Sequence, residues 1–542
     1  MTATSGIDAA EATRLAGRRA LRTYHGLEPT DHILAAIRDG LASGVTLFRA
    51  DNIGSPADVL AACEALQAAR PAGDPPLVIG IDQEGGQLQA VGYGATAWPG
   101  DLALGATGST ELARAAGLAI GSEAAAMGAT LVYAPDCDVL TRGSATPLGV
   151  RSFGADPDLV SRMTAAFVEG LQAAGVAGTL KHFPGHGSGV GDSHHSLPVV
   201  KDPAEVVRAR DLPPFRAGIA AGALTVMPGH IAVPALSDGR IERVSSSRRF
   251  VEGLLRDELG FRGVAISDAL DMGGAGDADQ LEATVVAAAE AGIDLLLLNH
   301  DPATEDAAVE ALARAIESGR HDKARARRSA ERVLALRARL GRGQRPDLSV
   351  VDSAEHRALA RQIAEASITL VRDEHGALRS WPAPGDRVAV LAPVPADLTP
   401  AETSSYLHLG LADAFRVRGV EVAEYIVPLD PTEAQVAALN AGVADADGVV
   451  LGTFDAVSFP GQAALARAVV ERSHAVAVAL RSPYDAEVLP ASLAVVCTYG
   501  IQAPQIEALA DALLGRIPFS GHLPVALGPG TPAAPTATVR RR

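Results

Sequence analysis

The sequence predicts an α/β protein built from a (β/α)8 TIM-type barrel followed by a three-layer αβα sandwich domain. Up to about residue 340, apolar runs of strand length alternate with alanine-rich helical stretches, a pattern typical of parallel strands buried on both faces. Seven or eight such units in about 340 residues suit a (β/α)8 barrel. A shorter series of the same kind follows. A doubly wound sheet is the alternative for the first series.

The first series runs from the start of the chain to an arginine-rich helix expected at about 324–340. Helical segments such as Thr110–Ala126 and Pro157–Ala174 separate its strands. We assign residues 1–341 to this barrel, with strands expected at 44–48, 77–81, 130–134, 176–180, 223–227, 263–267 and 293–298.

A polar stretch bearing glycine and proline, Gly341–Asp347, then interrupts the pattern. We assign residues 342–352 to a linker and 353–528 to the αβα sandwich domain. The remaining residues, 529–542, are rich in proline, alanine, threonine and arginine, and we expect a disordered tail. Strands of the second domain are expected at 367–371, 387–391, 448–452, 475–480 and 493–498.

Composition excludes several classes of protein. The charge sum of 47 − 64 = −17 argues against nucleic-acid binding, which needs clustered lysine and arginine. Aromatic residues are 4% of the chain, too few for a long stacking groove. Cys63, Cys137 and Cys497 lie far apart, without zinc or disulfide spacing, which suits a reducing compartment. With no signal-peptide core and no membrane-spanning run, we expect a cytoplasmic protein.

Ionisable residues gather just after the expected strands. In a parallel barrel these positions converge on one mouth. Burying so many ionisable groups costs several kcal/mol unless they are paired, so their concentration indicates a functional site. The segments are Asp82–Gly86, Asp136–Asp138, Gly149–Gly154, Lys181–His195, Met227–His230 and Ser267–Met272.

The segment 181–195 holds four of the 14 histidines. A metal site is one interpretation, because His182, His186, Asp192 and His194 are ligand types. Their spacing matches no zinc pattern, so we expect no metal. A catalytic loop is the second interpretation: a carboxylate beside an imidazole, as in Asp192-Ser193-His194, suits a general acid/base. A purely structural role for these histidines is the third.

Two carboxylates at strand ends have alternative roles. Asp268 is either the N-cap of the next helix or a carboxylate nucleophile. Asp271 serves equally well as that cap. Asp82 is either a turn residue or a ligand-facing carboxylate, in which case Arg151 and Lys181 are its counter-charges or bind hydroxyl groups.

These residues together resemble a known family. The stretch Lys181-His-Phe-Pro-Gly-His-Gly187, followed by Asp192-Ser-His194, resembles the signature of the β-N-acetylglucosaminidase branch of glycoside hydrolase family 3. The resemblance extends into the second domain, from Ser367 to Val525, so it matches the two-domain members. Further matching motifs are Asp82–Gly86, Arg151–Gly154, Met227–Ile231 and Ser267–Met272.

The resemblance implies a retaining exo-β-N-acetylglucosaminidase without cofactor, acting on small glycosides, muropeptides or chitooligosaccharides, with a role in cell-wall recycling. It implies that Asp268 is the nucleophile and that His194, paired with Asp192, is the general acid/base. It also implies which side chains contact the hydroxyls of the cleaved sugar: Asp82, Arg151, Lys181 and His182.

The chain departs from the family pattern at three places. Gln87 and Ala90 stand where the family commonly has arginine, which removes two basic residues near the pocket, and Asp136-Cys137 replaces a typically apolar pair. Four alternatives remain: a phosphorylase using phosphate as acceptor, a β-glucosidase, an inactive sugar-binding protein and a metallohydrolase.

Overall fold

The computed structural model describes most of the chain. The expected tail at 529–542 and residues 342–343 of the expected linker lie outside the described residues. The described ranges are 8–141, 148–189, 191–276, 280–340, 344–379, 385–471 and 474–528.

Eight parallel strands form the sheet of the N-terminal region, in the order β10-β1-β2-β3-β6-β7-β8-β9. The sheet curls until its edge strands meet, because a bridge pairs Ile266 with Leu295 and the Ser267 amide donates to the Leu295 carbonyl at 2.9 Å. The strands are β1 Ala20–Arg22, β2 Gly44–Leu47, β3 Val78–Ile81, β6 Leu131–Val132, β7 Ala177–Phe183, β8 Thr225–Pro228, β9 Val264–Ala265 and β10 Leu296–Leu297.

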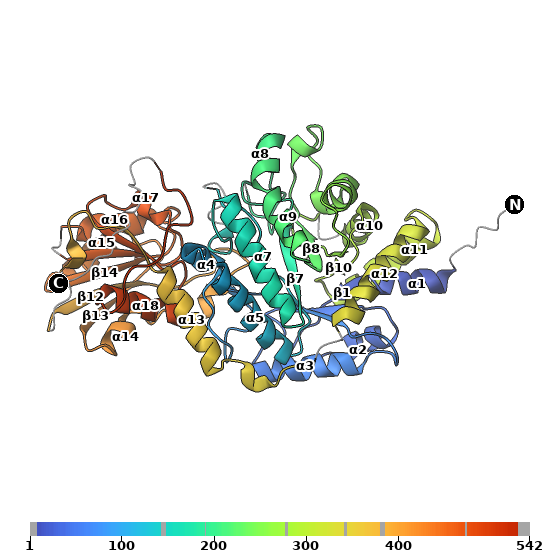
Figure 1. Ribbon diagram of the computed structural model, residues 1–542, viewed down its shortest axis with the longest axis horizontal. Helices are drawn as coiled ribbons and strands as arrows, with labels where there is room; N and C mark the ends of the chain where they lie inside the picture. The colour runs from blue at the N-terminus through green and yellow to red at the C-terminus, as the bar shows by residue number, and fades with distance from the viewer. Residues whose placement is uncertain are drawn as a thin grey trace.

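Helices surround this sheet and connect its strands (Figure 1). Local sequence explains where several begin: Ser55 forms a capping box with Asp58, and Asp156 and Asp301 each cap a helix that starts with proline. The helices are α1 Ala9–Gly17, α2 Asp31–Arg38, α3 Pro56–Ala68, α4 Asp101–Thr107, α5 Thr110–Ala126, α7 Pro157–Ala173, α8 Ala204–Arg210, α9 Leu212–Ala220, the π-helical η4 Arg249–Glu258, α10 Leu281–Ala291, α11 Pro302–Glu317 and α12 Lys323–Leu340.

All seven strands expected in this region are present, mostly shorter than expected, and an eighth, β1, was not foreseen. It reads Ala-Leu-Arg. Its arginine, Arg22, is buried, and the charge is paired by a contact from Arg22 Nε to Glu305 Oε2 at 3.0 Å. A second correction concerns Lys181 and His182, which lie on β7 rather than in the loop after it. The pairing of Lys181 with Met227 of β8 extends the strand that far.

A six-stranded sheet forms the C-terminal region, in the order β11-β16-β15-β14-β12-β13, with β11 antiparallel. Alternate residues of its strands face two cores: Leu391 belongs to the same core as Leu465 of α16, and Val390 to the same core as Leu509 of α18. Its elements are α13 Ala354–Ser367, β11 Thr369–Arg372, β12 Arg387–Pro393, α14 Leu411–Arg416, β13 Glu421–Val427, α15 Glu433–Gly442, β14 Gly448–Thr453, α16 Pro460–Val469, β15 Ala475–Ala479, α17 Asp485–Val488, β16 Ala494–Cys497 and α18 Ala503–Leu513.

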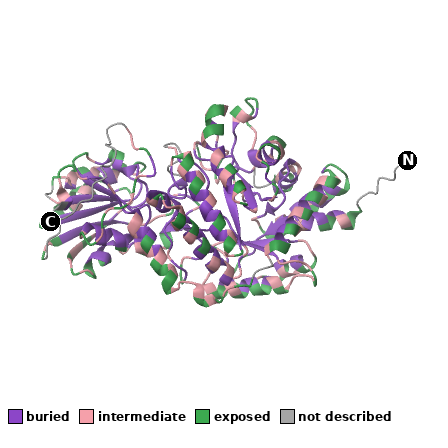
Figure 2. Cartoon of the chain, viewed as in Figure 1, coloured by how far each residue is buried: buried purple, intermediate pink, exposed green. Residues whose placement is uncertain are grey.

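The two regions pack closely against each other. Leu102 and Ala106 of α4 belong to the same core as the C-terminal strands, while Ala360 and Ile363 of α13 pack into the N-terminal core. Buried residues accordingly run through both sheets, with exposed residues on the outer helices (Figure 2). Within the described residues, no helix is both long and apolar enough to cross a membrane.

Candidate active site

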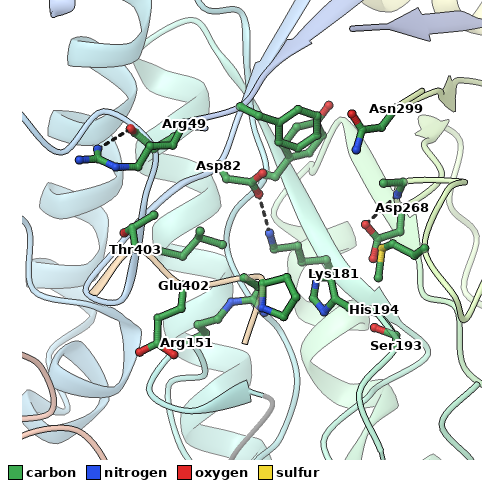
Figure 3. Close-up of a pocket in the computed structure, with 18 of the residues that line it drawn as sticks. Arg49, Asp82, Arg151, Lys181, Ser193, His194, Asp268, Asn299, Glu402 and Thr403 are labelled. Atoms are coloured by element: carbon green, nitrogen blue, oxygen red, sulfur yellow. Dashed lines mark hydrogen bonds and ion pairs between the residues drawn. The ribbon is translucent and has the colours of Figure 1, made fainter. Parts of the chain in front are cut away.

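The seven predicted site residues line one cavity of about 510 Å³ at the carboxyl ends of the N-terminal strands. Figure 3 shows Lys181 pointing toward Asp82, with Asp268 and His194 on one side of this pair and Arg49 and Thr403 on the other. The seven residues are Asp82, Arg151, Lys181, His182, Asp192, His194 and Asp268.

A buried ion network forms the floor of this cavity around Glu84, which we did not predict as a site residue. Arg151 donates to both Glu84 oxygens at 2.8 Å. Lys181 Nζ lies 2.5 Å from Glu84 Oε1 and 3.2 Å from Asp82 Oδ1. Glu84 lies on a hairpin of β4 Gln83–Gly85 and β5 Leu88–Gln89. Glu84 belongs to the motif Asp82–Gly86, which the sequence indicated as part of a functional site.

Charge pairing sets the ionisation of this network. Burial would raise the pKa of Glu84, but Arg151 and Lys181 outweigh it and lower the pKa to about 2. For Lys181 burial acts in the opposite direction and would lower the pKa, but Glu84 and Asp82 raise it. At Asp82 burial dominates and raises the pKa, with Lys181 opposing it. Two fixed cations therefore stand beside Asp82, whose carboxyl group binds a proton more readily than that of an exposed aspartate.

His182 extends the network toward two buried aspartates. Its Nδ1 donates to Asp138 Oδ2 at 2.8 Å, and burial lowers the pKa of His182 to about 4, so the imidazole is neutral near pH 7. Asp136 has no hydrogen-bond partner at Oδ2, and burial next to Asp138 raises its pKa to about 8. Asp136 is therefore a protonated carboxyl group at neutral pH.

The same three residues are metal-ligand types, with ligand atoms within 4.8 Å of one another. Two observations weigh against a metal between them. The bond from His182 to Asp138 already uses one atom of each, and the Arg151 guanidinium lies 3.9 Å from Asp136 Oδ2, where it would repel a cation.

Asp268 follows β9 and faces the cavity. Its Oδ1 accepts the Ala269 amide at 2.9 Å. Burial would raise the pKa of Asp268, but the neighbouring imidazoles of His230, His182 and His194 outweigh burial and lower this pKa, so the group is a carboxylate at neutral pH. The helix α10 begins only at Leu281 after Gln280. The suggested capping role is therefore wrong for both Asp268 and Asp271.

His230, a second residue that we did not assign to the site, supports the Asp268 segment. Its Nε2 donates to the Ala269 carbonyl at 3.0 Å and its Nδ1 accepts from Ser245 at 2.7 Å. This side chain holds the backbone next to Asp268 in place. His230 belongs to the segment Met227–His230 after β8, which the sequence indicated as part of a functional site.

The Asp192–His194 pair forms as the spacing indicated. His194 Nδ1 donates to Asp192 Oδ1 at 2.6 Å, and the His194 amide donates to the same oxygen at 2.9 Å. These bonds outweigh burial and lower the pKa of Asp192 to about 2. Gly273 and Gly274 then donate backbone bonds to the carbonyls of His194 and Ser193 at 3.1 and 2.9 Å. The loop that carries Asp192 and His194, which we call the histidine loop, is thus docked on the loop that follows Asp268.

The C-terminal region also reaches the cavity. Residues 397–406, which we call the rim segment, contribute Asp397, Pro400, Ala401, Glu402, Thr403 and Tyr406 to its lining. Glu402 is not placed to exchange protons with a ligand. Its side chain is fully buried against Arg481 at 3.1 Å and accepts from Ser404 and from the Leu398 amide. No motif in the sequence pointed to this segment, and Asn299, which follows β10 and also lines the cavity, was missed as well.

Comparisons with known proteins identify relatives of this chain. The family model described as glycosyl hydrolase family 3 N terminal domain matches residues 18–336. A beta-hexosaminidase of Stenotrophomonas maltophilia is 39% identical over 271 residues, 49% of this chain and 78% of that protein. A beta-hexosaminidase of Xylella fastidiosa is 38% identical over 277 residues, 50% of this chain and 80% of that protein.

One solved structure resembles nearly the whole chain. A glycoside hydrolase family 3 beta-N-acetylglucosaminidase from Paenibacillus sp. superposes with a TM-score of 0.88 at 34% identity, covering 95% of this chain and 98% of that one. A curled parallel sheet with carboxylates and cations at its strand ends thus belongs here to a glycoside hydrolase. The chain is a member of glycosyl hydrolase family 3.

Proposed function

We propose that the protein is a retaining exo-β-N-acetylglucosaminidase that removes terminal β-linked GlcNAc from small glycosides, muropeptides or chitooligosaccharides. The observation that carries this proposal is the Asp192–His194 pair, docked on the loop that follows Asp268 and facing the same cavity. In this proposal residues 1–341 form a catalytic (β/α)8-type barrel, 342–352 a linker and 353–528 an αβα sandwich domain. A place in cytoplasmic cell-wall recycling rests on the family resemblance.

The proposed reaction has two displacements. A carboxylate oxygen of Asp268 attacks the anomeric carbon as the bond to the leaving-group oxygen breaks, and His194 gives its Nε2 proton to that oxygen. Water then attacks the anomeric carbon of the glycosyl-enzyme, His194 takes back a proton, and Asp268 is released. Two inversions give net retention. The carboxylate of Asp192 fixes the imidazole through Nδ1, which leaves Nε2 for this transfer.

The remaining predicted residues serve substrate binding in this proposal. Lys181 and Arg151 are held as buried cations by Glu84 and offer donors to sugar hydroxyls, while Asp82 accepts from them. His182, neutral and held at Nδ1 by Asp138, presents its other ring nitrogen to the sugar. Polar contacts of this kind suit a single sugar better than stacking platforms do.

The test is turnover of a chromogenic β-GlcNAc glycoside by the wild-type protein and by Asp268→Ala and His194→Ala variants, with Asp238→Ala on the exposed surface as control. We expect activity in the wild type and the control, and a loss of at least about 10²-fold in both site variants. Full activity in Asp268→Ala would refute the assignment. A β-glucoside measured in parallel distinguishes β-glucosidase activity, and calorimetric binding of GlcNAc without turnover would indicate an inactive sugar-binding protein.

Phosphorolysis is the second candidate function, favoured by one observation. The proton donor in this proposal is the imidazole of His194, which unlike a carboxylate would not repel an incoming phosphate. Product analysis on a β-GlcNAc substrate with and without phosphate separates the two reactions. GlcNAc-1-phosphate supports phosphorolysis, and free GlcNAc alone in both reactions excludes it.

A further inference from the structure

The rim segment lies on the side of the cavity opposite the reacting groups. Strand order separates Asp268, which follows β9, from Arg49 and Asp82, which follow β2 and β3, with β10 and β1 between them. Figure 3 shows the same division, with Arg49, Glu402 and Thr403 on one side of Asp82 and Lys181, and Asp268 and His194 on the other. A sugar whose anomeric carbon meets Asp268 therefore extends toward the rim segment.

Hydrogen bonds attach the rim segment to the β4–β5 hairpin. The Thr403 amide donates to the Gln87 carbonyl at 2.7 Å, and the Gln89 amide donates to Thr403 Oγ1 at 3.2 Å. The side chain of Gln502, also from the C-terminal region, donates to the Gly86 carbonyl at 2.7 Å. The hairpin that carries Glu84 is therefore fastened to the C-terminal region at three points.

A buried ion pair between Glu402 and Arg481 holds the rim segment on the protein. Glu402 pairs with Arg481 in the protein interior and accepts from the Leu398 amide, which is partly buried, at 3.0 Å. A buried ion pair is costly to break, because removing one partner leaves the other charge without compensation. These contacts hold the segment in place at Glu402.

A contact between Tyr406 and Arg49 holds the outer end of the rim segment. The Arg49 guanidinium lies 4.3 Å from the centre of the Tyr406 ring and donates to the Ala90 carbonyl at 2.9 Å. Within the described residues, Tyr93 and Tyr406 are the exposed tyrosines, at 80% and 57%. Of the two, Tyr406 alone lines the cavity. An exposed aromatic ring held in place by a cation is thus part of the cavity wall.

We propose that the rim segment, latched by Thr403 and by the Arg49–Tyr406 contact, closes the cavity beyond the non-reducing end of the bound sugar and restricts cleavage to one terminal residue. In a pyranose the 4-hydroxyl lies across the ring from the anomeric carbon, so this hydroxyl faces the segment. The wall therefore rejects sugars extended at O4. This inference rests on the proposed function, and it makes Tyr406 and Thr403 determinants of specificity and Arg49 a positioning residue.

The test compares two aryl β-GlcNAc substrates, one unmodified and one with a 4-O-methyl group. We expect the wild type to cleave the unmodified substrate and to discriminate against the 4-O-methyl substrate by at least about 100-fold in kcat/KM, because a rigid wall excludes an added group. In Tyr406→Ala, and more so in Tyr406→Ala with Thr403→Val, this discrimination falls at least about tenfold, as expected when a well-packed contact is removed. The unmodified substrate serves as the internal reference for folding.

Three further measurements sharpen the result. Tyr93→Ala, an exposed tyrosine outside the cavity lining, keeps the wild-type discrimination. Arg49→Ala relaxes it in the wild-type background but adds nothing to Tyr406→Ala, which a general structural effect would not reproduce. With an aryl β-chitobioside, the wild type first releases GlcNAc, whereas the double variant also releases the disaccharide directly.

The outcomes separate the two proposals. A wild type that cleaves neither aryl substrate contradicts the proposed function. The inference about the rim segment is overturned if the wild type cleaves both substrates with similar kcat/KM. It is also overturned if Tyr406→Ala and its combination with Thr403→Val stay active with undiminished discrimination. Either result leaves the proposed function standing.

Discussion

Replacing Glu84 by glutamine tests whether the buried ion network organises the site. The substitution keeps the shape of the side chain but removes the charge that Arg151 and Lys181 share. All three side chains are at most 5% exposed, so neither cation gains water in exchange. Lys181 would then face only Asp82, and Arg151 only the distant Asp136 oxygen at 3.9 Å.

The magnitude follows from these contacts. Glutamine has one acceptor oxygen and an amide NH2 that opposes the donors of Arg151 and Lys181, so at least one of the three charge-assisted contacts is lost. Removing one partner from a buried ion pair costs about 3–5 kcal/mol. We expect the free energy of unfolding to fall by that amount. We also expect kcat/KM to fall by at least about tenfold, because Lys181 and Arg151 lose their fixed positions.

The matched control is Glu258→Gln. Glu258 also contacts two arginines, Arg208 at 2.6 Å and Arg216 at 3.0 Å, but it lies on the surface with 37% of its side chain exposed. Exposed pairs of this kind contribute below about 1 kcal/mol. Denaturant unfolding and steady-state kinetics on both variants give the comparison. If Glu84→Gln is as stable and as active as Glu258→Gln, the reasoning about the network is wrong.

Three more predictions concern the reacting groups and their surroundings. In Asp192→Asn the imidazole of His194 loses its carboxylate, and kcat falls by about 10²-fold for a poor leaving group but much less for an activated aryl one, as leaving-group kinetics would show. In Gly274→Ala the new Cβ would lie 2.7 Å from the Ser193 carbonyl oxygen, which displaces the histidine loop and lowers kcat at least about tenfold, whereas Gly253→Ala, with open space around it, has no such effect. Because burial raises the pKa of Asp136 to about 8 from an ordinary value of 3.8, the folded protein holds this proton more tightly than the unfolded chain, and stability is lost as the pH rises through that interval. Asp136→Asn removes this loss, so thermal unfolding between about pH 5 and 8 should depend less on pH than in the wild type. An unchanged slope would contradict the raised pKa.

The strands that the sequence revealed are those with apolar runs. The buried parallel strand β3 is an uninterrupted run of apolar residues and glycine, as is β14 up to its last residue, Thr453, and both were located within one or two residues. Four strands were missed, and β1 and β13 show why, because both lack that signal. In β1, Arg22 is buried only because Glu305, far along the chain, pairs with it, and β13 is an exposed edge strand with glutamates at positions 421 and 424.

The site residues followed a similar rule. Positions just after strands, such as Asp82 and Asp268, were recognisable because parallel strands bring their ends together. Glu84 and His230 lay in the same motifs, but their roles depend on partners that spacing alone does not define. The rim segment carried no signal, because its place is set by bonds between Thr403 and Gln87, residues separated by 316 positions.

The most direct test of the proposed chemistry is to identify the residue that becomes glycosylated. Rapid acid quenching during turnover of an aryl β-GlcNAc substrate, followed by peptide mass spectrometry, would capture the intermediate. We expect one N-acetylhexosaminyl group on the peptide containing Asp268, no such label in Asp268→Asn, and a product that retains the β configuration by NMR. A label on another residue, or an inverted product, would contradict the assignment of Asp268 as the nucleophile.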